Sequence, residues 1–555
     1  MIEKKTLKIG ILIGNFNCLE NWELRIIERI ILDKTLHLSL LIKDGRSKKE
    51  NFNVTKKLKD LLKNKNIFNR ILFKFQVLIE KSLFKVKSTV KKETIIKELN
   101  SIKTIYLNPK RKGFLDVFSK NDSEKVKSYD LDIILRHEFN IIRGDILKSS
   151  KFGIWSFHHA DNSVNRGGPP AFWEILNNES VIGVTLQQLT PELDGGFIID
   201  KAFYNRDWSY VRLQNRIFEA SVTILFKNIK LLQNGHYNIE GSPVYYNPLY
   251  RKPKLIQLLQ YIFNFYFSIL EEYWKKVNFM TFGSRYNCWT LFIGNGSFLN
   301  STLFRLRPVK MPKNEFWADP FIFNYNSKNY IFFENYNYKL KKGKISCGII
   351  EGDQLIEVSD VLDLDYHLSY PFIFEEDNSI FLIPETSENN RLEIYRCIDF
   401  PNNWELYSTA FDGEKIIDAH IYRDQDMQKW LFLNKQETEN TSYNSDLHIY
   451  KFNNLKFDDL QPHTKNPVII DSKTARNGGA IFKSHNQLFR PSQGNIDGIY
   501  GKALNINKIE KLTINEYVEK TVMVAHPNFK EGLVAMHHLH QKNGLFVIDA
   551  AYAKK

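Results

Sequence analysis

The sequence predicts a two-part protein, an α/β unit followed by an all-β unit built as a five-bladed propeller. Three observations lead to this prediction. The first half alternates strand-like apolar runs with helical patterns, the second half repeats one hairpin five times, and a proline-containing segment separates the halves. The expected divisions are an α/β domain at 1–240, a linker and connecting helix at 241–280, and the propeller at 281–555.

The composition is that of a folded, multidomain chain. The 555 residues are 43% hydrophobic and 14% aromatic, which is more apolar material than a disordered chain carries. The net charge of +14 would suit anionic partners. However, lysine accompanies asparagine and isoleucine throughout the chain, and the aromatic residues do not alternate with arginine as they do in nucleic-acid binders. We therefore expect no nucleic-acid partner.

Several signals are missing from the sequence. Four widely spaced cysteines form neither a CxxC pair nor a disulfide framework, so no metal site is expected. The N-terminus lacks the cleavage signature of a signal peptide, and no run reaches the ~18 apolar residues of a membrane span. These features favour a cytoplasmic protein. The apolar, basic segment 66–90 and the apolar segment 255–274, which has basic residues on either side, leave open a peripheral contact with the inner membrane face, although the second is more simply a helix buried between domains.

The elements of the first half follow one another in a regular order. A strand at 7–14, a helix at 22–32 and a strand at 36–42 form a β-α-β start. Next come lysine-rich helices within 55–100, strands at 104–107 and 131–136, a short helix at 144–150, and a strand in GIWSFHH. Strands that alternate with helices predict a mostly parallel, Rossmann-like sheet.

The densest polar cluster follows that last strand. Ser156 and His158 are two residues apart, so their side chains point to the same face of the strand. They lie at the carboxyl edge of the sheet, where open α/β sheets bind ligands. A tight Arg-Gly-Gly loop and a second glycine-rich turn that carries a carboxylate come next. The candidate site residues of this half are Ser156, His158, His159, Asp161, Arg166, Gly167 and Asp194.

This cluster resembles the folate-dependent formyltransferases, whose motif runs G-x-x-N-x-H-P-S-L-L-P-x-x-R-G-x-x-P and then L-D-x-G. The matching positions are Gly153, His158, Arg166, Gly167, Pro170, Leu193, Asp194 and Gly196. The resemblance implies a Rossmann-like domain that binds 10-formyltetrahydrofolate and moves its formyl group to an amine. It further implies that His158 is the catalytic imidazole and that Asp194 organises proton transfer through it or through a water.

Two positions depart from that motif. The family's asparagine is Ser156 here, and a hydroxyl is shorter than an amide and donates once, so stabilisation of the tetrahedral oxyanion must be weaker or come from elsewhere. The family's Pro-Ser after the histidine is His159-Ala160, followed by Asp161. His159 and Asp161 either form a substitute network or indicate a different reaction. The glycine-rich turns downstream favour a functional site over a merely hydrogen-bonded strand end.

The second half contains five segments that each read as a strand, a polar turn and a second strand. They begin at Asp319, Tyr370, Asp418, Gly478 and His537, which are 51, 48, 60 and 59 residues apart. This spacing fits propeller blades of four strands with variable outer loops. A β-sandwich would have no reason to repeat one hairpin at near-constant spacing.

In a propeller the innermost strands begin near one mouth of the central channel, so the repeat starts are expected to meet. Carboxylates there could accept hydrogen bonds from sugar hydroxyls, and aromatic rings could stack on sugar faces. The alternative for any single carboxylate is that it caps a strand inside a blade. The candidate substrate-binding residues are Asp319, Glu385, Asp418, His420, Arg490, Gln493 and His537, with Glu334, Arg476 and His538 close by.

This half carries resemblances of its own. ADPF at 318–321, the RPSQ segment and the late His-His pair resemble the propeller-like N-terminal domain of plant glucosamine inositolphosphorylceramide transferases. The strand starts also resemble five-bladed glycosidases such as arabinanases, in which paired carboxylates act. Where those enzymes place an acidic glutamate before Gly-Pro, this chain reads Asn477-Gly478-Gly479. The resemblance therefore implies sugar binding more than hydrolysis.

Three functional hypotheses follow. The leading one is a formyltransferase-like enzyme that acts on a nucleotide- or lipid-linked amino sugar in surface polysaccharide biosynthesis, with the propeller as its sugar-recognition module. The second makes the propeller a glycan-binding or glycan-processing unit with a degenerate formyltransferase domain as scaffold. The third makes both halves binding modules at a membrane-associated assembly site.

Overall fold

The computed structural model describes residues 6–46, 67–85, 88, 90–192, 195–241, 247 and 249–554. Leu193, Asp194 and the part of the predicted helical segment before residue 67 lie outside them. The chain forms two compact units, residues 1–202 with 206–266 and residues 203–205 with 267–555, here called the α/β unit and the all-β unit. The division falls within helix α8 (Leu255–Phe282), inside the predicted connecting segment.

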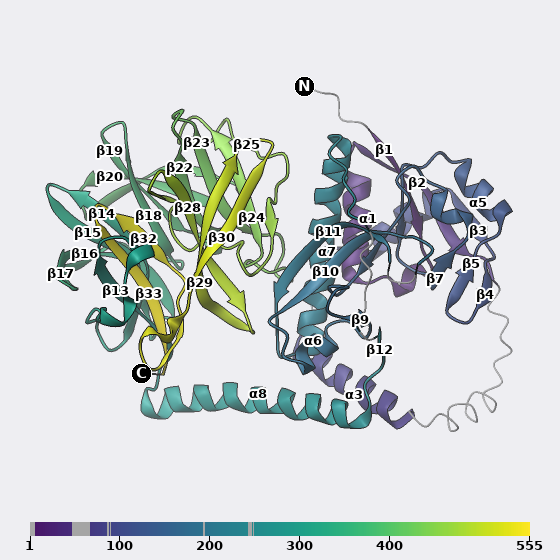
Figure 1. The fold of residues 1–555 in the computed structure, drawn as a ribbon, viewed down its shortest axis with the longest axis horizontal. Coiled ribbons are helices and arrows are strands. Elements are labelled where there is room, and N and C mark those ends of the chain that lie inside the picture. Colours follow the sequence, from purple (N-terminus) through teal and green to yellow (C-terminus); the bar gives the residue numbers. More distant parts are fainter. Residues whose placement is uncertain are drawn as a thin grey trace. The chain divides into compact units, whose positions relative to one another are not determined.

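A seven-stranded sheet forms the centre of the α/β unit (Figure 1). Its strand order is β11-β10-β8-β6-β1-β2-β3. The pairs β1–β2, β1–β6, β2–β3 and β6–β8 are parallel, whereas β10 runs antiparallel to β8. The strands are β1 Leu7–Leu12, β2 Leu36–Asp44, β3 Thr104–Leu107, β6 Ile133–Arg136, β8 Ile154–His158, β10 Val181–Gln188 and β11 Phe197–Asn205. The predicted mostly parallel sheet is thus confirmed.

Local sequence explains these elements. β1 is an apolar run buried at every position but one, as a parallel strand covered on both faces requires. Helix α1 begins with a capping box between Glu20 and Glu23 and packs on β2, α4 and α7. The helices of this unit are α1 Asn21–Leu32, α3 Ile67–Leu83, α4 Lys92–Ser101, α5 Lys120–Lys127, α6 Phe172–Leu176, α7 Tyr210–Gln233 and the start of α8.

Two smaller sheets complete the α/β unit. β4 (Lys110–Lys112), β5 (Leu115–Val117) and β7 (Ile141–Arg143) form a three-stranded sheet. β9 (Arg166–Gly167) and β12 (Leu249–Tyr250) form a two-stranded one. The second pair joins the glycine-rich loop to the segment that leads into α8.

Glu80 of α3 joins three helices of this unit. Its carboxylate accepts hydrogen bonds from the Ser209 hydroxyl at 2.7 Å, from the Val211 backbone N–H at 3.1 Å and from the Tyr261 hydroxyl at 2.6 Å. The Tyr261 oxygen in turn accepts from the Tyr210 N–H at 2.8 Å. Because Ser209 caps α7, the buried charge of Glu80 lies at the positive N-terminus of that helix. These contacts fix α3 and α8 against α7.

The all-β unit consists of five antiparallel sheets, and each predicted repeat supplies a hairpin in one of them. The first four sheets follow the chain order. The first sheet contains β14 Glu315–Tyr325, β15 Lys328–Asn337, β16 Lys342–Glu351 and β17 Gln354–Leu362, and the second contains β18 Ser369–Glu376, β19 Ser379–Glu385, β20 Leu392–Asp399 and β21 Asn403–Ala410. The third contains β22 Lys415–Arg423, β23 Lys429–Gln436, β24 Asp446–Phe452, β25 Gln461–Pro462 and β26 Ile469–Ile470. The fourth contains β27 Phe482–Ser484, β28 Gln487–Ile496, β29 Ile499–Leu512 and β30 Tyr517–Ala525.

The fifth sheet joins the two ends of the all-β unit. It contains the first strand, β13 (Tyr286–Asn295), and the last strands, β31 (Leu533–Ala535), β32 (Leu539–Lys542) and β33 (Leu545–Lys554). β13 and β33 pair antiparallel from Tyr286 opposite Lys554 to Asn295 opposite Leu545, and they lie side by side in Figure 1. This pairing removes an exposed strand edge from each end.

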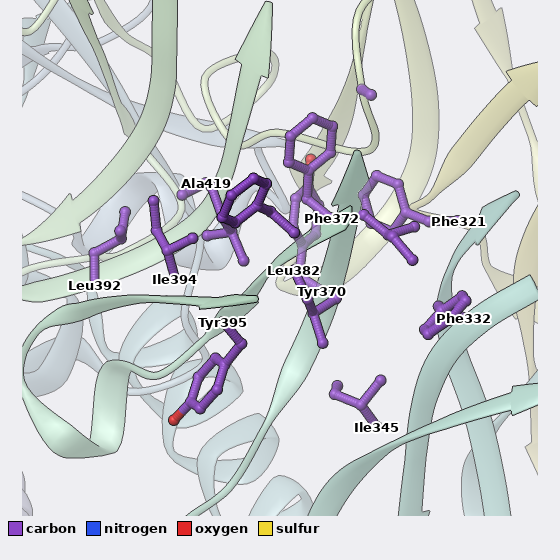
Figure 2. Close-up of a cluster of buried hydrophobic side chains, with 14 of the residues drawn as sticks. Phe321, Phe332, Ile345, Tyr370, Phe372, Leu382, Leu392, Ile394, Tyr395 and Ala419 are labelled. Carbon is purple, nitrogen blue, oxygen red and sulfur yellow. The ribbon is translucent and has the colours of Figure 1, made fainter. Parts of the chain in front are cut away.

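Apolar side chains from consecutive sheets share one core. Figure 2 shows Phe321 and Phe332 of the first sheet, Tyr370 and Leu382 of the second and Ala419 of the third within a single cluster. These residues come from the first two strands of each sheet, which contain the apolar runs of the repeat. The core thus extends from one sheet to the next. Among the described residues, no helix combines the length and apolar character needed to cross a bilayer.

Replacing Tyr261 with phenylalanine tests the Glu80 contacts. The variant removes a donor from a buried carboxylate and an acceptor from the Tyr210 N–H, so we expect a loss of about 2 kcal/mol in the free energy of unfolding of the α/β unit. Denaturant unfolding followed by tryptophan fluorescence measures this. Tyr266→Phe, at a half-exposed position of the same helix, is the matched control, and equal midpoints for the two variants would contradict the assignment.

Candidate functional site

The carboxyl edge of the seven-stranded sheet carries the first candidate site. β6 ends at Arg136, which stands level with Ser156 because Leu135 pairs with Trp155. Arg136 donates from Nη1 to Ser156 Oγ at 3.0 Å and from Nη2 to the Phe139 carbonyl oxygen at 3.0 Å. The hydroxyl of Ser156 therefore acts as an acceptor for a guanidinium.

The guanidinium of Arg136 lacks a counter-ion within the described part of the chain. Its two hydrogen-bond acceptors are neutral, and its buried Nε–H has no hydrogen-bond partner there. Burial lowers the pKa of Arg136, and the negative charge of Asp116 opposes that shift. A buried cation without a carboxylate is costly unless a ligand supplies the negative charge. The site therefore suits an anionic group or a developing oxyanion.

His158, two residues beyond Ser156 on the same strand, shares its face of the sheet. Its Nε2 lies 3.1 Å from the Asn165 carbonyl oxygen, so Nε2 donates and, in the neutral ring, Nδ1 carries the lone pair. The Asn165 amide donates to Glu174 at 2.9 Å. Burial raises the pKa of Glu174 to about 7. The loop 159–174 thus orients the His158 ring.

His159 points to the opposite face of the strand. Its ring lies 4.4 Å from that of Phe218 and packs edge-on against Trp22, and its Nε2 is 3.0 Å from Ser221 Oγ. Burial, together with the neighbouring His158, lowers the pKa of His159 to about 3, so the ring is neutral. The structure gives this predicted substrate-binding residue a packing role.

Asp161 and the Arg-Gly-Gly loop also have partners within the protein. Asp161 Oδ1 accepts from Lys201 Nζ at 2.6 Å and from the Ser163 N–H at 3.0 Å. Gly167 has φ +94°, and a Cβ there would lie 2.1 Å from the Tyr250 carbonyl oxygen. Its neighbour Arg166 lies in the same strand, β9, which pairs with β12. The glycine is needed for this close backbone approach, whereas Asp194 lies outside the described residues.

The second candidate site lies where the repeats of the all-β unit begin. β14, β18 and β22 each bulge at the repeat start, and the residue there has a left-handed backbone: Asp319 at φ +51°, Tyr370 at +45° and Asp418 at +48°. A bulge redirects a side chain out of the regular alternation. Positive φ at three non-glycine residues is strain of the kind that marks functional sites. Sequence periodicity predicted the repeat starts but not the bulges.

A cavity of about 380 Å³ opens at these starts. Asp319, Glu385 and His537, three of the predicted residues, line it. Aromatic rings and further polar groups complete the wall, namely Trp289, Phe316, Tyr336, Tyr443, Tyr500, Glu334, His367, Ser369, Ser387, Glu388, Lys415, Gln436 and Arg476. The mixture of flat rings with hydrogen-bonding groups is what recognition of a polyhydroxylated ring requires.

Arg476 links two of the carboxylates. Its Nε donates to Asp418 Oδ2 at 2.6 Å, and its Nη2 lies 3.8 Å from Glu385 Oε2. Gln493 also donates to Asp418 Oδ2, at 3.2 Å. The guanidinium further lies about 5.0 Å from the rings of Tyr443 and Tyr500. Asp418 and Gln493 therefore position Arg476 at the cavity wall.

Asp549, His537 and Asp319 form a buried chain of charges. His537 Nδ1 donates to Asp549 Oδ1 at 2.7 Å, and its Nε2 lies 3.7 Å from Asp319 Oδ1. Burial opposes ionisation of Asp319, but His537 and His538 outweigh it and lower the pKa of Asp319 to about 2. Burial likewise opposes the charge on His537, and the carboxylates of Asp549 and Asp319 raise its pKa above the ordinary value. An ion-paired chain results.

The same three residues bring possible ligand atoms within 4.8 Å of one another, as a metal site would need. Hydrogen bonds already occupy both oxygens of Asp549, which accept from the backbone N–H groups of Asp319, His537 and His538 and from the His537 ring. We assign the trio to ion pairing.

Glu334 has the opposite environment to Asp319. Burial and the nearby carboxylates, with Asp319 first among them, raise the pKa of Glu334 well above its ordinary value. His367 Nδ1 accepts from the Gly343 N–H, which leaves Nε2 to face Glu334 Oε1 at 3.5 Å. The cavity therefore holds one carboxylate that ionises readily and one whose protonated form is favoured.

His420 and Arg490, also predicted to bind substrate, lie away from the cavity wall. His420 is buried with Nδ1 at 3.2 Å from the Tyr370 hydroxyl, and burial lowers its pKa to about 3. Arg490 is fully buried and donates to Glu519 at 2.6 and 2.8 Å. Both residues stabilise the sheets around the site.

Sequence reasoning missed several groups. Arg136 ends a predicted strand, and its role depends on which strand lies beside it. Trp289, Tyr443 and Tyr500 come from segments outside the repeats. Asp549 did leave a signal, because an aspartate inside the apolar run LFVIDAA needs a buried partner.

Sequence comparison assigns each half to a class. Residues 305–543 match the family model described as glucosamine inositolphosphorylceramide transferase 1, N-terminal. The N-terminal half is similar to formyltransferases. The chain therefore joins a formyltransferase-like α/β unit to an all-β region related to that plant family.

Individual relatives cover only part of the chain. Glucosamine inositolphosphorylceramide transferase 1 of Oryza sativa subsp. indica is 32% identical over 225 residues, 40% of this chain and 30% of that protein. The bifunctional polymyxin resistance protein ArnA of Wigglesworthia glossinidia brevipalpis is 28% identical over 200 residues, 33% of this chain and 30% of that protein. The chain thus spans under a third of the length of both relatives.

Solved structures also resemble the chain. A sugar N-formyltransferase from Shewanella aligns with a TM-score of 0.29 and 11% identity, covering 46% of this chain and 88% of that one.

The charge chain predicts a pH profile. Protonated His537 contributes stability that is complete below its ordinary pKa of 6.5 and is lost as pH rises through its raised pKa. Ionised Asp319 contributes stability above its ordinary pKa of 3.8 that is lost as pH falls through about 2. His537→Gln should flatten the alkaline side and move acid unfolding to higher pH, because Asp319 loses its main cation.

Thermal unfolding midpoints measured from pH 3 to 9 test this profile. Asp426→Asn, at an exposed turn of the same unit, should keep the wild-type profile. A His537→Gln curve parallel to that of the wild type would show that the imidazolium does not contribute as described.

Proposed function

We propose that the chain is a formyltransferase that moves a formyl group from 10-formyltetrahydrofolate to the amine of a nucleotide- or lipid-linked amino sugar, in the biosynthesis of a surface polysaccharide. The observation that carries this proposal is the grouping of His158, Ser156 and Arg136 at the carboxyl edge of a sheet whose sequence relatives are formyltransferases, with no counter-ion for Arg136 among the residues that the structure describes. Formyl transfer needs a base for the amine proton and a positive environment for the carbonyl oxygen.

Each residue has a role that its contacts support. His158, oriented by the donation of its Nε2 to the Asn165 carbonyl, can serve as the base for the proton that the attacking amine loses. Arg136 supplies the positive charge that stabilises negative charge on the carbonyl oxygen, in place of the amide donor of the formyltransferase motif. Ser156 positions the guanidinium by accepting from Nη1. Asp194, which the sequence motif would add to this set, lies outside the described residues.

The Nε–H of Arg136, buried and without a hydrogen-bond partner in the described ranges, is the observation that fits a bound formyl donor. 10-Formyltetrahydrofolate would supply the formyl group, and tetrahydrofolate would leave with the proton that His158 takes from the amine; Arg136 and His158 are the residues that would hold the formyl group.

We further propose that the five sheets are the blades of a propeller that recognises the sugar. The strand order within each sheet, the pairing of the first and last strands and the meeting of the repeat starts support this arrangement. The cavity offers Trp289, Tyr336 and Tyr500 as ring platforms and Glu385 and Arg476 as hydrogen-bonding groups. The name of the rice relative specifies glucosamine and a ceramide, which supports an amino sugar and a lipid-linked form.

Substitutions at the sheet edge test the reaction. With 10-formyltetrahydrofolate and a panel of amino-sugar nucleotides, wild type should give formylated product detectable by mass spectrometry. His158→Ala should abolish it, and Arg136→Met should lower kcat by about 100-fold or more, as loss of an oxyanion donor does. Arg136→Lys keeps the charge and should lose less activity.

Arg143→Met, an arginine of β7 that donates to the Ile142 carbonyl, serves as the matched control and should leave kcat near that of the wild type. If wild type formylates no amino sugar, the proposed reaction is wrong. If wild type is active and Arg136→Met is equally active, the reaction stands and the role of Arg136 does not.

A second candidate function is glycan processing in the cavity. The opposite pKa shifts of Asp319 and Glu334 favour it, since two carboxylates with separated pKa values can act as base and acid. On this hypothesis Asp319→Asn and Glu334→Gln abolish release of reducing sugar from a glycan panel while His158→Ala has no effect. Turnover that survives both cavity substitutions would exclude it.

A further inference from the structure

Helix α3 of the α/β unit exposes one row of large apolar side chains. Phe68, Ile71, Phe75 and Leu78 follow the helical spacing i, i+3, i+7 and i+10, and each is at least 60% exposed. The side of the helix toward the protein holds the buried Gln76 and Glu80 together with Phe73, whose ring packs against Phe172 and Tyr210. Scattered exposed leucines are ordinary on a surface, but a row with two phenylalanines marks an interaction face.

The start of α8 lies beside α3 and also exposes large apolar side chains. The Tyr261 hydroxyl donates to Glu80, and the Phe265 ring packs against Phe84 just after α3, so the two helices are in contact. On α8, Ile256 is 80% exposed and Leu259 is 51% exposed. Two neighbouring helices of the α/β unit therefore both present apolar side chains to solvent.

All the exposed charged residues of these two segments are basic. Arg70, Lys74 and Lys81 of α3 are exposed and lie along a stripe next to the apolar row, at i, i+4 and i+11. Lys85, which follows the helix at i+15, is exposed as well. Before α8, Arg251, Lys252 and Lys254 are exposed as well. Within 67–85 and 249–270, Glu80 is the single acidic residue, and it is buried. The apolar row thus has a purely basic flank.

The apolar row and the basic residues beside it together favour one kind of binding partner. A second copy of the chain would bring seven cations against seven, which repels. An anionic lipid surface matches both parts, because its headgroups attract lysine and arginine while the phenylalanines enter the boundary of the acyl region. We propose that the apolar face of α3, with the start of α8, docks the α/β unit on an anionic membrane surface.

Co-sedimentation of the full chain with vesicles tests this docking without using activity. Phosphatidylcholine vesicles with about 30% phosphatidylglycerol should bind the wild type about tenfold more strongly than pure phosphatidylcholine, and added salt should weaken the binding. Phe75→Glu/Leu78→Glu should abolish binding to both. Lys74→Glu/Lys81→Glu should remove the preference for phosphatidylglycerol.

Leu340→Glu/Leu406→Glu, at exposed positions of the all-β unit, is the control and should bind as the wild type does. Because the substituted side chains on α3 are exposed, the thermal midpoint of each variant should match that of the wild type. Binding of Phe75→Glu/Leu78→Glu at the wild-type level, or no binding of the wild type to anionic vesicles, would overturn the proposal. So would a wild-type dimer in light scattering that the same substitutions dissociate, because the face would then join two copies.

Discussion

Asp549 is the group on which both the closure of the all-β unit and the shape of its cavity depend. It stands on the last strand, β33, which pairs with the first strand, β13. Its carboxylate accepts hydrogen bonds from the backbone of Asp319, His537 and His538 and from the His537 ring. A buried carboxylate must find such donors, because burial removes its hydration. The contacts that hold the ends of the unit together therefore also orient the two cavity side chains Asp319 and His537.

The bulges at the repeat starts connect the fold of the all-β unit with its candidate site. Regular alternation would direct successive side chains of an inner strand to opposite faces of its sheet. At Asp319, Tyr370 and Asp418 the backbone instead adopts a left-handed conformation, which is costly for a residue with a Cβ and most unusual for tyrosine. Three copies of the same costly conformation at the same repeat position indicate that side-chain direction there matters more than local stability.

The apolar patterns of the sequence predicted those helices and strands that are determined by the residues within them. The strands at 104–107 and 131–136, the helix at 22–32 and all five hairpins were predictable because apolar periodicity determines them. The partnership of Arg136 with Ser156 was not, since it depends on β6 lying beside β8 rather than on either segment alone. The opposite directions of His158 and His159 were predictable in principle, since neighbouring residues of a strand face opposite sides. Only the structure shows what each side meets.

At position 156, where the formyltransferase motif has an asparagine, this chain has a serine whose hydroxyl holds a guanidinium. An asparagine contributes a dipole to a carbonyl oxygen, whereas a guanidinium contributes a full positive charge and planar N–H groups. That charge must be positioned, and a hydroxyl at 156 does so by accepting from Nη1. Nη2 donates to the Phe139 carbonyl, and the Nε–H is buried without a partner among the described residues. A donor left in that state would be stabilised by a negatively charged ligand atom, which is the charge that the proposed reaction develops on the carbonyl oxygen.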